Sequence, residues 1–270
     1  MDDDRTALGR RGLVIAAPEA PIEVLRHVEF AGASGRPLRL DVHRPANASA
    51  PVPVVWIASG YRDEGFASAV GCAFKEMQWT RSWAHLFAAA GMAAIAATNE
   101  DPAADLRAGL EAVSRRGEEL GVDPGRAGIF ATSGHAPTAL SALMRDFPIN
   151  VSSAAFAYGY TLDLAGSDAV ARASASFRFA NPCAGRSLEE LRADVPLLLV
   201  RAGRDEMPGL NASLDAFAAG ALATNLPLTL LNHPEAPHAF DLFHDDARSR
   251  SIIREIVRFL AETLGAEAGG

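Results

Sequence analysis

The sequence predicts an α/β fold in which a mostly parallel, doubly wound sheet carries helices on both faces. Six continuous apolar runs are typical of strands that are buried on both sides. The segments between them repeat apolar residues at helical spacing, and alternation of this kind favours a parallel sheet. The runs are 51–61, 91–99, 126–134, 151–159, 195–203 and 226–234, and the helical segments include 79–90, 101–120, 137–147 and 249–264.

The chain of 270 residues, 49% of them hydrophobic, is long enough to form one such domain. Residues 27–30 and 37–45 alternate apolar and polar side chains across a Gly-rich turn, which predicts an antiparallel hairpin at one edge of the sheet. We interpret 1–25 as an N-terminal arm and 26–264 as a single domain. Residues 160–194 fit the alternation of strands and helices least well, and we expect them to form a small lid.

Composition excludes several classes of partner. The net charge is -8 and no long basic run occurs, which argues against nucleic acid and anionic membranes. The N-terminus lacks the apolar stretch of a signal peptide, and the most apolar run, 86–97, is too short to span a bilayer. We therefore expect a cytoplasmic protein that acts on a small-molecule substrate. The sequence is also compatible with a homo-oligomer.

No cofactor or metal is predicted. Cys72 and Cys183 lie far apart, and neither belongs to a CxxC pair or a zinc-like cluster. The sequence contains no phosphate-binding GxxxxGK[ST] loop and no HExxH motif, and its histidines lack metal-ligand spacing.

Polar residues follow three of the predicted strands at the sheet edge where open α/β sheets form their sites. Ser133 ends the run at 126–134, Asp205 follows the run at 195–203, and His238 comes shortly after the last run. Serine, acid and histidine thus occur in that chain order, each at a strand end.

Three stretches carry a resemblance to a known family: "IFATSGHAPTAL" at 129–140, "VRAGRDEMPGLN" at 200–211 and "APHAFDLFHDD" at 236–246. With them, residues 37–264 resemble the α/β-hydrolases and are most similar to the dienelactone-hydrolase-like branch. The resemblance implies a serine hydrolase that cleaves a small ester, lactone or thioester through an acyl-enzyme. Ser133 is then the nucleophile, His238 the base, and Asp205 the acid that orients it.

The nucleophile turn departs from the usual pattern. A serine on a tight strand-to-helix turn calls for small residues two places before and two places after, as in G-x-S-x-G. Ala131 satisfies the first position, whereas His135 occupies the second. We expect His135 to line the pocket or to contact the substrate.

The resemblance also implies an oxyanion hole. The backbone N–H of Gly134, directly after the serine, is one expected donor. The second is the N–H of Tyr61 in the loop after the run at 51–61, where Gly60 gives the backbone room. Gly60 and Tyr61 are expected to contact the substrate as well.

Each assignment has an alternative. Ser133 is also suited to capping a helix. Glu206 and Asp163 compete with Asp205, and His233 and His244 compete with His238. Charged residues elsewhere fit solvated surfaces: a charged loop at Arg62, Asp63 and Glu64, and an exposed helical pair at Lys75 and Glu76.

The function has alternatives too. The same three residues serve in acyl transfer and in C–C bond hydrolysis. A ligand-binding protein that kept the fold without turnover is a third interpretation, because a fold hosts many functions and His135 breaks the usual turn.

Overall fold

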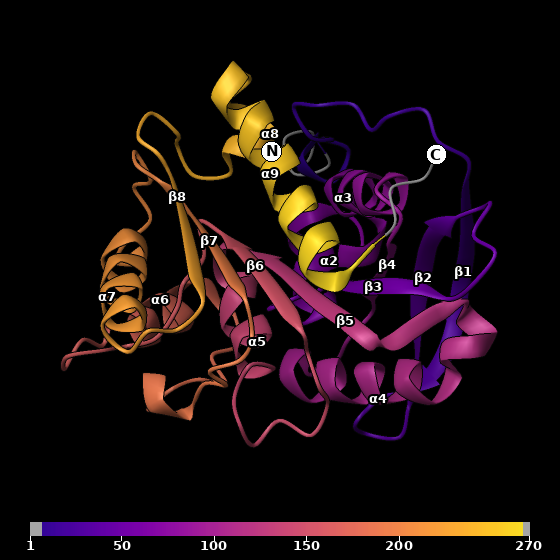
Figure 1. The fold of residues 1–270 in the computed structure, drawn as a ribbon. Coiled ribbons are helices and arrows are strands. Elements are labelled where there is room, and N and C mark those ends of the chain that lie inside the picture. The colour runs from indigo at the N-terminus through magenta and orange to yellow at the C-terminus, as the bar shows by residue number, and fades with distance from the viewer. Residues whose placement is uncertain (1–6, 267–270) are drawn as a thin grey trace.

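A computed structural model describes residues 7–266 of the chain. Its centre is an eight-stranded sheet with the order β1-β2-β4-β3-β5-β6-β7-β8 (Figure 1). β1 and β2 form the predicted antiparallel hairpin, β2 is antiparallel to β4, and all other neighbours are parallel. The strands are β1 (Ile22–Ala31), β2 (Pro37–Pro45), β3 (Val52–Ile57), β4 (Ala93–Ala97), β5 (Val122–Thr132), β6 (Ser153–Ala157), β7 (Leu197–Ala202) and β8 (Leu228–His233).

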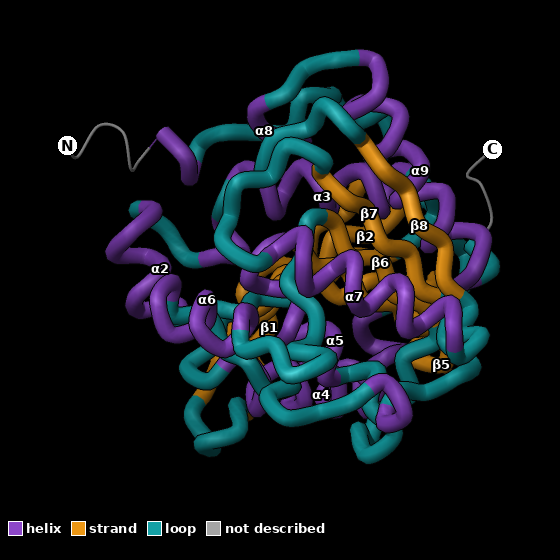
Figure 2. Tube along the Cα trace, turned by 90° about the vertical axis from the view of Figure 1, so that its left-hand side faces the viewer, coloured by secondary structure: helices purple, strands orange, loops and turns teal. Residues whose placement is uncertain are grey.

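Helices cover both faces of the sheet and enclose two separate apolar cores. In Figure 1 α3 and α9 lie above the sheet and α4 lies below it, and Figure 2 shows the strands between the helical layers. The doubly wound prediction is confirmed. The α-helices are α2 (Asp63–Val70), α3 (Gln78–Ala89), α4 (Pro102–Leu120), α5 (Ala136–Ser141), α6 (Ala169–Phe177), α7 (Leu210–Ala223), α8 (Phe240–Phe243) and α9 (Ala247–Leu264); the 3-10 turns are η1 (Phe74–Glu76), η2 (Ser133–His135) and η3 (Leu188–Glu190).

The apolar runs became strands because their side chains fill both cores at once. β4 and β6 are buried at every position. The run at 226–234 is the exception, since β8 pairs only with β7 and ends the sheet. Its burial on both faces was wrongly predicted: Leu230 is 41% exposed.

Three boundaries differ from the sequence-based expectation. β1 begins at Ile22, so the last part of the arm predicted for 1–25 lies in the sheet, and residues 1–6 lie outside the described residues. The segment predicted as a charged loop begins α2, whose first turn holds two acidic residues, as the positive end of a helix favours. α5 stops at Ser141 instead of continuing to 147.

Lys75 was predicted to lie on a solvated surface, and this was wrong. It is 3% exposed, and its Nζ donates to both carboxylate oxygens of Asp41 at 3.0 Å. Burial alone would raise the pKa of Asp41, but the His27 N–H and the Lys75 ammonium outweigh it and hold that pKa below its ordinary value. The pair joins η1, just before α3, to the second strand of the hairpin.

Removing one member of this pair leaves the other charged and buried. We expect Lys75→Met to lower the free energy of unfolding by about 3–5 kcal/mol, measured by urea titration at neutral pH. The double variant Lys75→Met/Asp41→Leu should lose much less, because no charge is left behind. A loss below about 1 kcal/mol for the single variant, the value of an exposed pair, would contradict the buried pair.

Candidate active site

Ser133 lies where β5 turns sharply into η2 and α5. Its φ is +50°, a left-handed conformation that costs a non-glycine residue about 1–3 kcal/mol and persists only where its surroundings enforce it. Two backbone hydrogen bonds do so: the Ser133 N–H donates to the Tyr158 carbonyl at 3.0 Å, and the Tyr160 N–H donates to the Ser133 carbonyl at 3.2 Å. The serine is thereby fixed against the segment after β6.

The crowding expected around such a turn is present, and it also falls on glycines outside the G-x-S-x-G positions. A Cβ on Gly159 would lie 2.5 Å from the Ala136 Cβ. A Cβ on Gly60 would lie 2.3 Å from the Gly134 carbonyl oxygen and 2.7 Å from the His135 Cα. Gly60, in the neighbouring loop, thus provides the space that a small residue at position 135 would otherwise supply.

Ser133, His238 and Asp205 lie in a hydrogen-bonded row. The Ser133 Oγ is 2.9 Å from the His238 Nε2, and the His238 Nδ1 is 2.7 Å from the Asp205 Oδ2. The other Asp205 oxygen accepts the Met207 N–H at 2.9 Å, so both oxygens of this fully buried carboxylate are occupied. The His238 side chain remains 28% exposed and can be reached from solvent.

The loops that carry the acid and the histidine are joined by their backbones. The Gly203 N–H donates to the His233 carbonyl, and the Arg204 N–H donates to the Ala236 carbonyl, both at 2.8 Å. A Cβ on Gly203 would lie 2.5 Å from the Pro234 carbonyl oxygen, so this approach requires glycine. The two loops therefore hold a fixed separation.

The residues that compete with Asp205 for the acid and with His238 for the base lie outside the hydrogen-bonded row. Glu206 is exposed. Both Asp163 oxygens accept backbone N–H groups in the first turn of α6. The His233 Nε2 and the His244 Nε2 each face Asp246, at 3.3 Å.

His233, His244 and Asp246 place three ligand-type atoms within 4.8 Å of one another, although the sequence spacing indicated no metal site. Asp246 caps α9 through the Ser249 N–H. A metal on the His233 Nε2 would leave the remaining ring proton on the buried Nδ1, which has no partner in the described part of the chain. Hydrogen bonding of His233 to Asp246 and Ser249 accounts for the group without a metal.

His135 is 9% exposed and lies within an aromatic cluster instead of an open pocket. Its Nδ1 accepts the Gly60 N–H at 2.9 Å, so a neutral ring carries its proton on Nε2. Burial lowers the pKa of His135 to about 3, and the ring is therefore neutral at physiological pH. Its ring centroid lies between 4.7 and 6.5 Å from the rings of Tyr61, Phe66, Phe74 and Trp79.

Tyr61 lies across from the serine turn. Its backbone N–H donates to the Ser59 Oγ at 3.3 Å, and the Ser59 hydroxyl donates to the Tyr61 carbonyl at 3.1 Å. The same loop is held by the segment 160–194, where the Ala180 N–H donates to the Gly60 carbonyl at 2.7 Å. Residues of this segment thus reach the edge of the site.

Asp241 is the residue of the site that sequence reasoning missed. Its buried carboxylate accepts the Tyr158 hydroxyl at 2.6 Å and the indole N–H groups of Trp79 and Trp83 at 2.7 and 3.1 Å. Burial raises the pKa of Asp241 against these three hydrogen bonds. A signal was available: tryptophans four residues apart share one helix face, and buried indole N–H groups need an acceptor.

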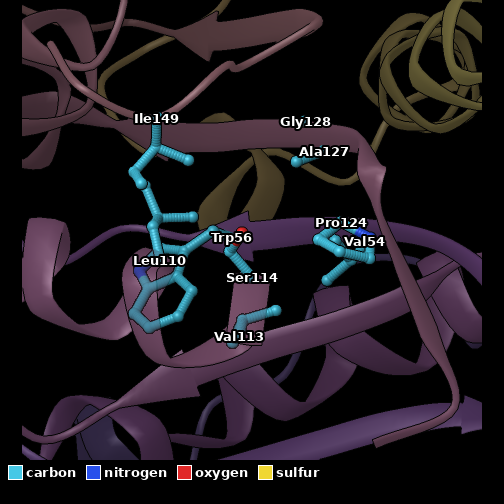
Figure 3. Close-up of a pocket in the computed structure, with 9 residues that line it drawn as sticks. All are labelled: Val54, Trp56, Leu110, Val113, Ser114, Pro124, Ala127, Gly128 and Ile149. Atoms are coloured by element: carbon cyan, nitrogen blue, oxygen red, sulfur yellow. The ribbon is translucent and has the colours of Figure 1, made fainter. Parts of the chain in front are cut away.

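Two small hollows lie away from the Ser133 hydroxyl. One is apolar and lies between α4 and strands β3 and β5 (Figure 3); it is lined by Val54, Trp56, Leu110, Val113, Ser114, Pro124, Ala127, Gly128 and Ile149. The second is lined by Ser59 and Asn99, whose side-chain amide has no partner among residues 7–266. Neither has room for an ester substrate.

No family model and no curated protein matches this sequence. Solved structures do match. Brefeldin A esterase, described as a bacterial homologue of human hormone-sensitive lipase, has a TM-score of 0.73 and 17% identity over 98% of this chain and 84% of that one. A hyperthermophilic esterase from the archaeon Pyrobaculum calidifontis has a TM-score of 0.71 and 18% identity over 98% and 92%.

A third similar structure is an α/β-hydrolase enzyme from the metagenome of Lake Arreo, Spain, in a Ser161Ala mutant form. Its TM-score is 0.72, with 18% identity over 98% of this chain and 88% of that one. In the described residues, no helix combines the length and the apolar character needed to span a membrane.

Strand order, the N-terminal hairpin and the likeness to these solved structures together establish that the chain has the α/β-hydrolase fold.

The neutral His135 makes the fold sensitive to acid. Its pKa falls from 6.5 to about 3 on folding, so the unfolded chain binds one more proton between these values, and stability is lost as pH falls through that range. The slope from this group is about 1.4 kcal/mol per pH unit. We expect His135→Asn, whose amide oxygen can still accept the Gly60 N–H, to remove this contribution and so lower the slope by about 1.4 kcal/mol per pH unit. Urea unfolding at pH 7, 6, 5 and 4 measures it; equal slopes in both proteins would contradict the assignment.

Proposed function

We propose that the protein is a serine hydrolase that cleaves a small carboxylic ester, lactone or thioester through an acyl-enzyme on Ser133. The row of hydrogen bonds from the Ser133 Oγ through the His238 ring to the Asp205 carboxylate carries this proposal. A strained serine on a strand-to-helix turn, hydrogen-bonded to a histidine with a buried acid behind it, is the arrangement that activates a hydroxyl for acyl transfer.

The reaction follows from these contacts. The Ser133 Oγ attacks the substrate carbonyl carbon while the His238 Nε2 takes the hydroxyl proton. The Asp205 carboxylate accepts the Nδ1–H and stabilises the imidazolium. Collapse of the tetrahedral intermediate breaks the bond to the leaving group, which takes the proton from Nε2. Water, deprotonated by His238, then attacks the acyl-enzyme and releases the acid and free Ser133.

The developing oxyanion needs donors that the fold has left free. The Gly134 N–H is one, because it lies in the first turn of a helix, where N–H groups lack intrahelical acceptors, and it makes no other backbone hydrogen bond among the described residues.

The substrate class rests on the site and on the named esterases among the similar structures. We also propose that the protein acts like the dienelactone-hydrolase-like branch that its sequence resembles, with residues 160–194 as the segment that selects the acyl group. The contact of Ala180 with the Gly60 loop supports a role for this segment at the site.

Covalent labelling tests the nucleophile. We expect a fluorophosphonate to add once to the wild type, as intact-protein mass spectrometry measures, because the reagent phosphonylates an activated serine. Ser133→Ala should take no label, and His238→Ala should take it far more slowly. An unlabelled, well-folded wild type would contradict the proposal and favour a binding protein that kept the fold.

Asp205 can be tested separately from its neighbour. We expect Asp205→Asn to lower kcat for p-nitrophenyl acetate by about 10⁴, the scale seen when this change leaves the histidine in the wrong tautomer. The exposed Glu206→Gln serves as the matched control and should keep wild-type turnover. Equal losses in both variants, or a loss only in Glu206→Gln, would show that the orienting acid is assigned wrongly.

A further inference from the structure

The backbone donor expected in the loop after β3, the Tyr61 N–H, and the neighbouring Gly60 N–H both already have partners. The Gly60 N–H donates to the His135 Nδ1 at 2.9 Å, within good hydrogen-bond geometry. The Tyr61 N–H donates to the Ser59 Oγ, although at the longer distance of 3.3 Å. An oxyanion would have to displace a partner to receive either of these groups, so neither the Gly60 N–H nor the Tyr61 N–H is a ready donor.

The Tyr61 side chain offers a different donor at the same place. A Cβ on Gly134 would lie 2.3 Å from the Tyr61 hydroxyl oxygen. Since a carbon–carbon bond is about 1.5 Å long, this oxygen lies within about 4 Å of the Gly134 Cα. Gly134 has to be glycine because the hydroxyl and the Phe179 ring occupy that space.

The hydroxyl is free to donate. It makes no hydrogen bond to any residue between 7 and 266, whereas the nearby Tyr160 hydroxyl donates to the Pro208 carbonyl at 3.0 Å. Burial, with a contribution from Tyr160, raises the pKa of Tyr61 to about 12, so the phenol keeps its proton throughout the neutral range. Tyr61 is only partly buried, so its hydroxyl can be reached by solvent or by a ligand that needs a hydrogen-bond donor.

From these observations we infer that the Tyr61 hydroxyl, instead of its backbone N–H, is the second oxyanion donor, acting with the Gly134 N–H. The inference rests on the proposed function and names a further catalytic residue for it. Tyrosine side chains are among the groups that can form such holes. In the reaction, the phenol O–H donates to the oxygen that becomes negative in the tetrahedral intermediate and keeps its own proton.

His135 is then a positioning residue. Its Nδ1 fixes the Gly60 backbone, and its ring meets the Tyr61 ring edge-on, with centroids 4.9 Å apart and an interplanar angle of 72°. Phe179 contacts Tyr61 with centroids 6.2 Å apart. His135, which stands where a small residue is usual, therefore holds Tyr61 in place. The Tyr61 hydroxyl then donates to the oxyanion where a backbone N–H usually does.

The test compares Tyr61→Phe with Tyr160→Phe, a nearby buried tyrosine whose hydroxyl donates to a backbone carbonyl. Steady-state hydrolysis of p-nitrophenyl acetate is measured, together with inhibition by an aryl trifluoromethyl ketone, whose serine adduct carries an oxyanion. We expect Tyr61→Phe to lower kcat about 10²–10³-fold with little change in KM, as for the loss of one oxyanion donor. Affinity for the ketone should fall by a similar factor. Tyr160→Phe should stay close to the wild type in both.

A second variant covers the case in which Tyr61→Phe loses its fold, judged by thermal unfolding. Incorporation of a fluorinated tyrosine at position 61 retains the shape and lowers the phenol pKa. Because a phenolate cannot donate, activity should then fall at a lower alkaline pH than in the wild type, which a structural role would not cause.

The outcomes distinguish a failure of the hydrolase assignment from a failure of the Tyr61 inference. If the wild type is labelled at Ser133 and hydrolyses the ester, but Tyr61→Phe matches Tyr160→Phe, the hydrolase assignment stands and the Tyr61 inference is wrong. An unchanged alkaline limb in the fluorinated protein overturns it as well. A wild type that neither takes the label nor hydrolyses the ester removes both.

Discussion

The buried carboxylate of Asp241 is the interaction on which the site depends. It accepts hydrogen bonds from the tryptophan pair on α3 and from Tyr158 after β6, and its own backbone carbonyl accepts the Val14 N–H. Tyr158 in turn receives the Ser133 N–H and packs edge-on against the His238 ring at 5.1 Å. One residue thus links a helix, the N-terminal arm, the serine turn and the base. A buried carboxylate is costly to desolvate, and three donors offset that cost only while all of these elements are docked.

The second constraint is steric and concerns where two backbones meet. The loop after β3 and the turn after β5 approach so closely that a Cβ on Gly60 would meet the backbone of Gly134 and His135. A Cβ on Gly134 would meet the Tyr61 hydroxyl and the Phe179 ring. In the usual pattern the small residues belong to the serine turn alone. Here the requirement is shared with the facing loop, and the histidine at 135 uses the released space to hold that loop by a hydrogen bond. The turn and the loop therefore behave as one unit whose sequence has to change together.

The layered fold could be predicted from the sequence because it follows from local pattern. The three residues of the hydrogen-bonded row could be predicted because they follow strands and lie in stretches that resemble the α/β-hydrolases. Apolar runs identify buried strands, and the rule that sites form at strand ends brings Ser133, Asp205 and His238 to one edge. The exposed face of β8 could not be predicted, since edge position depends on strand order. Lys75 and Asp41 are far apart in sequence, so no window reveals their pairing. The donor state of Tyr61 depends on which backbone groups other residues have already occupied, and that is a property of the packed structure alone.

The carboxylate at 241 also has a spectroscopic consequence. The chain has three tryptophans, and two of them, Trp79 and Trp83, donate their indole N–H groups to this one carboxyl group. Indole emission responds to nearby charge and to the exchange of a protein partner for water. Much of the intrinsic tryptophan fluorescence therefore reports on the hydrogen bonds to Asp241, which hold the elements that carry Ser133 and His238. A change in emission wavelength during acidification or ligand addition would follow loosening of the site itself, without any label attached to it.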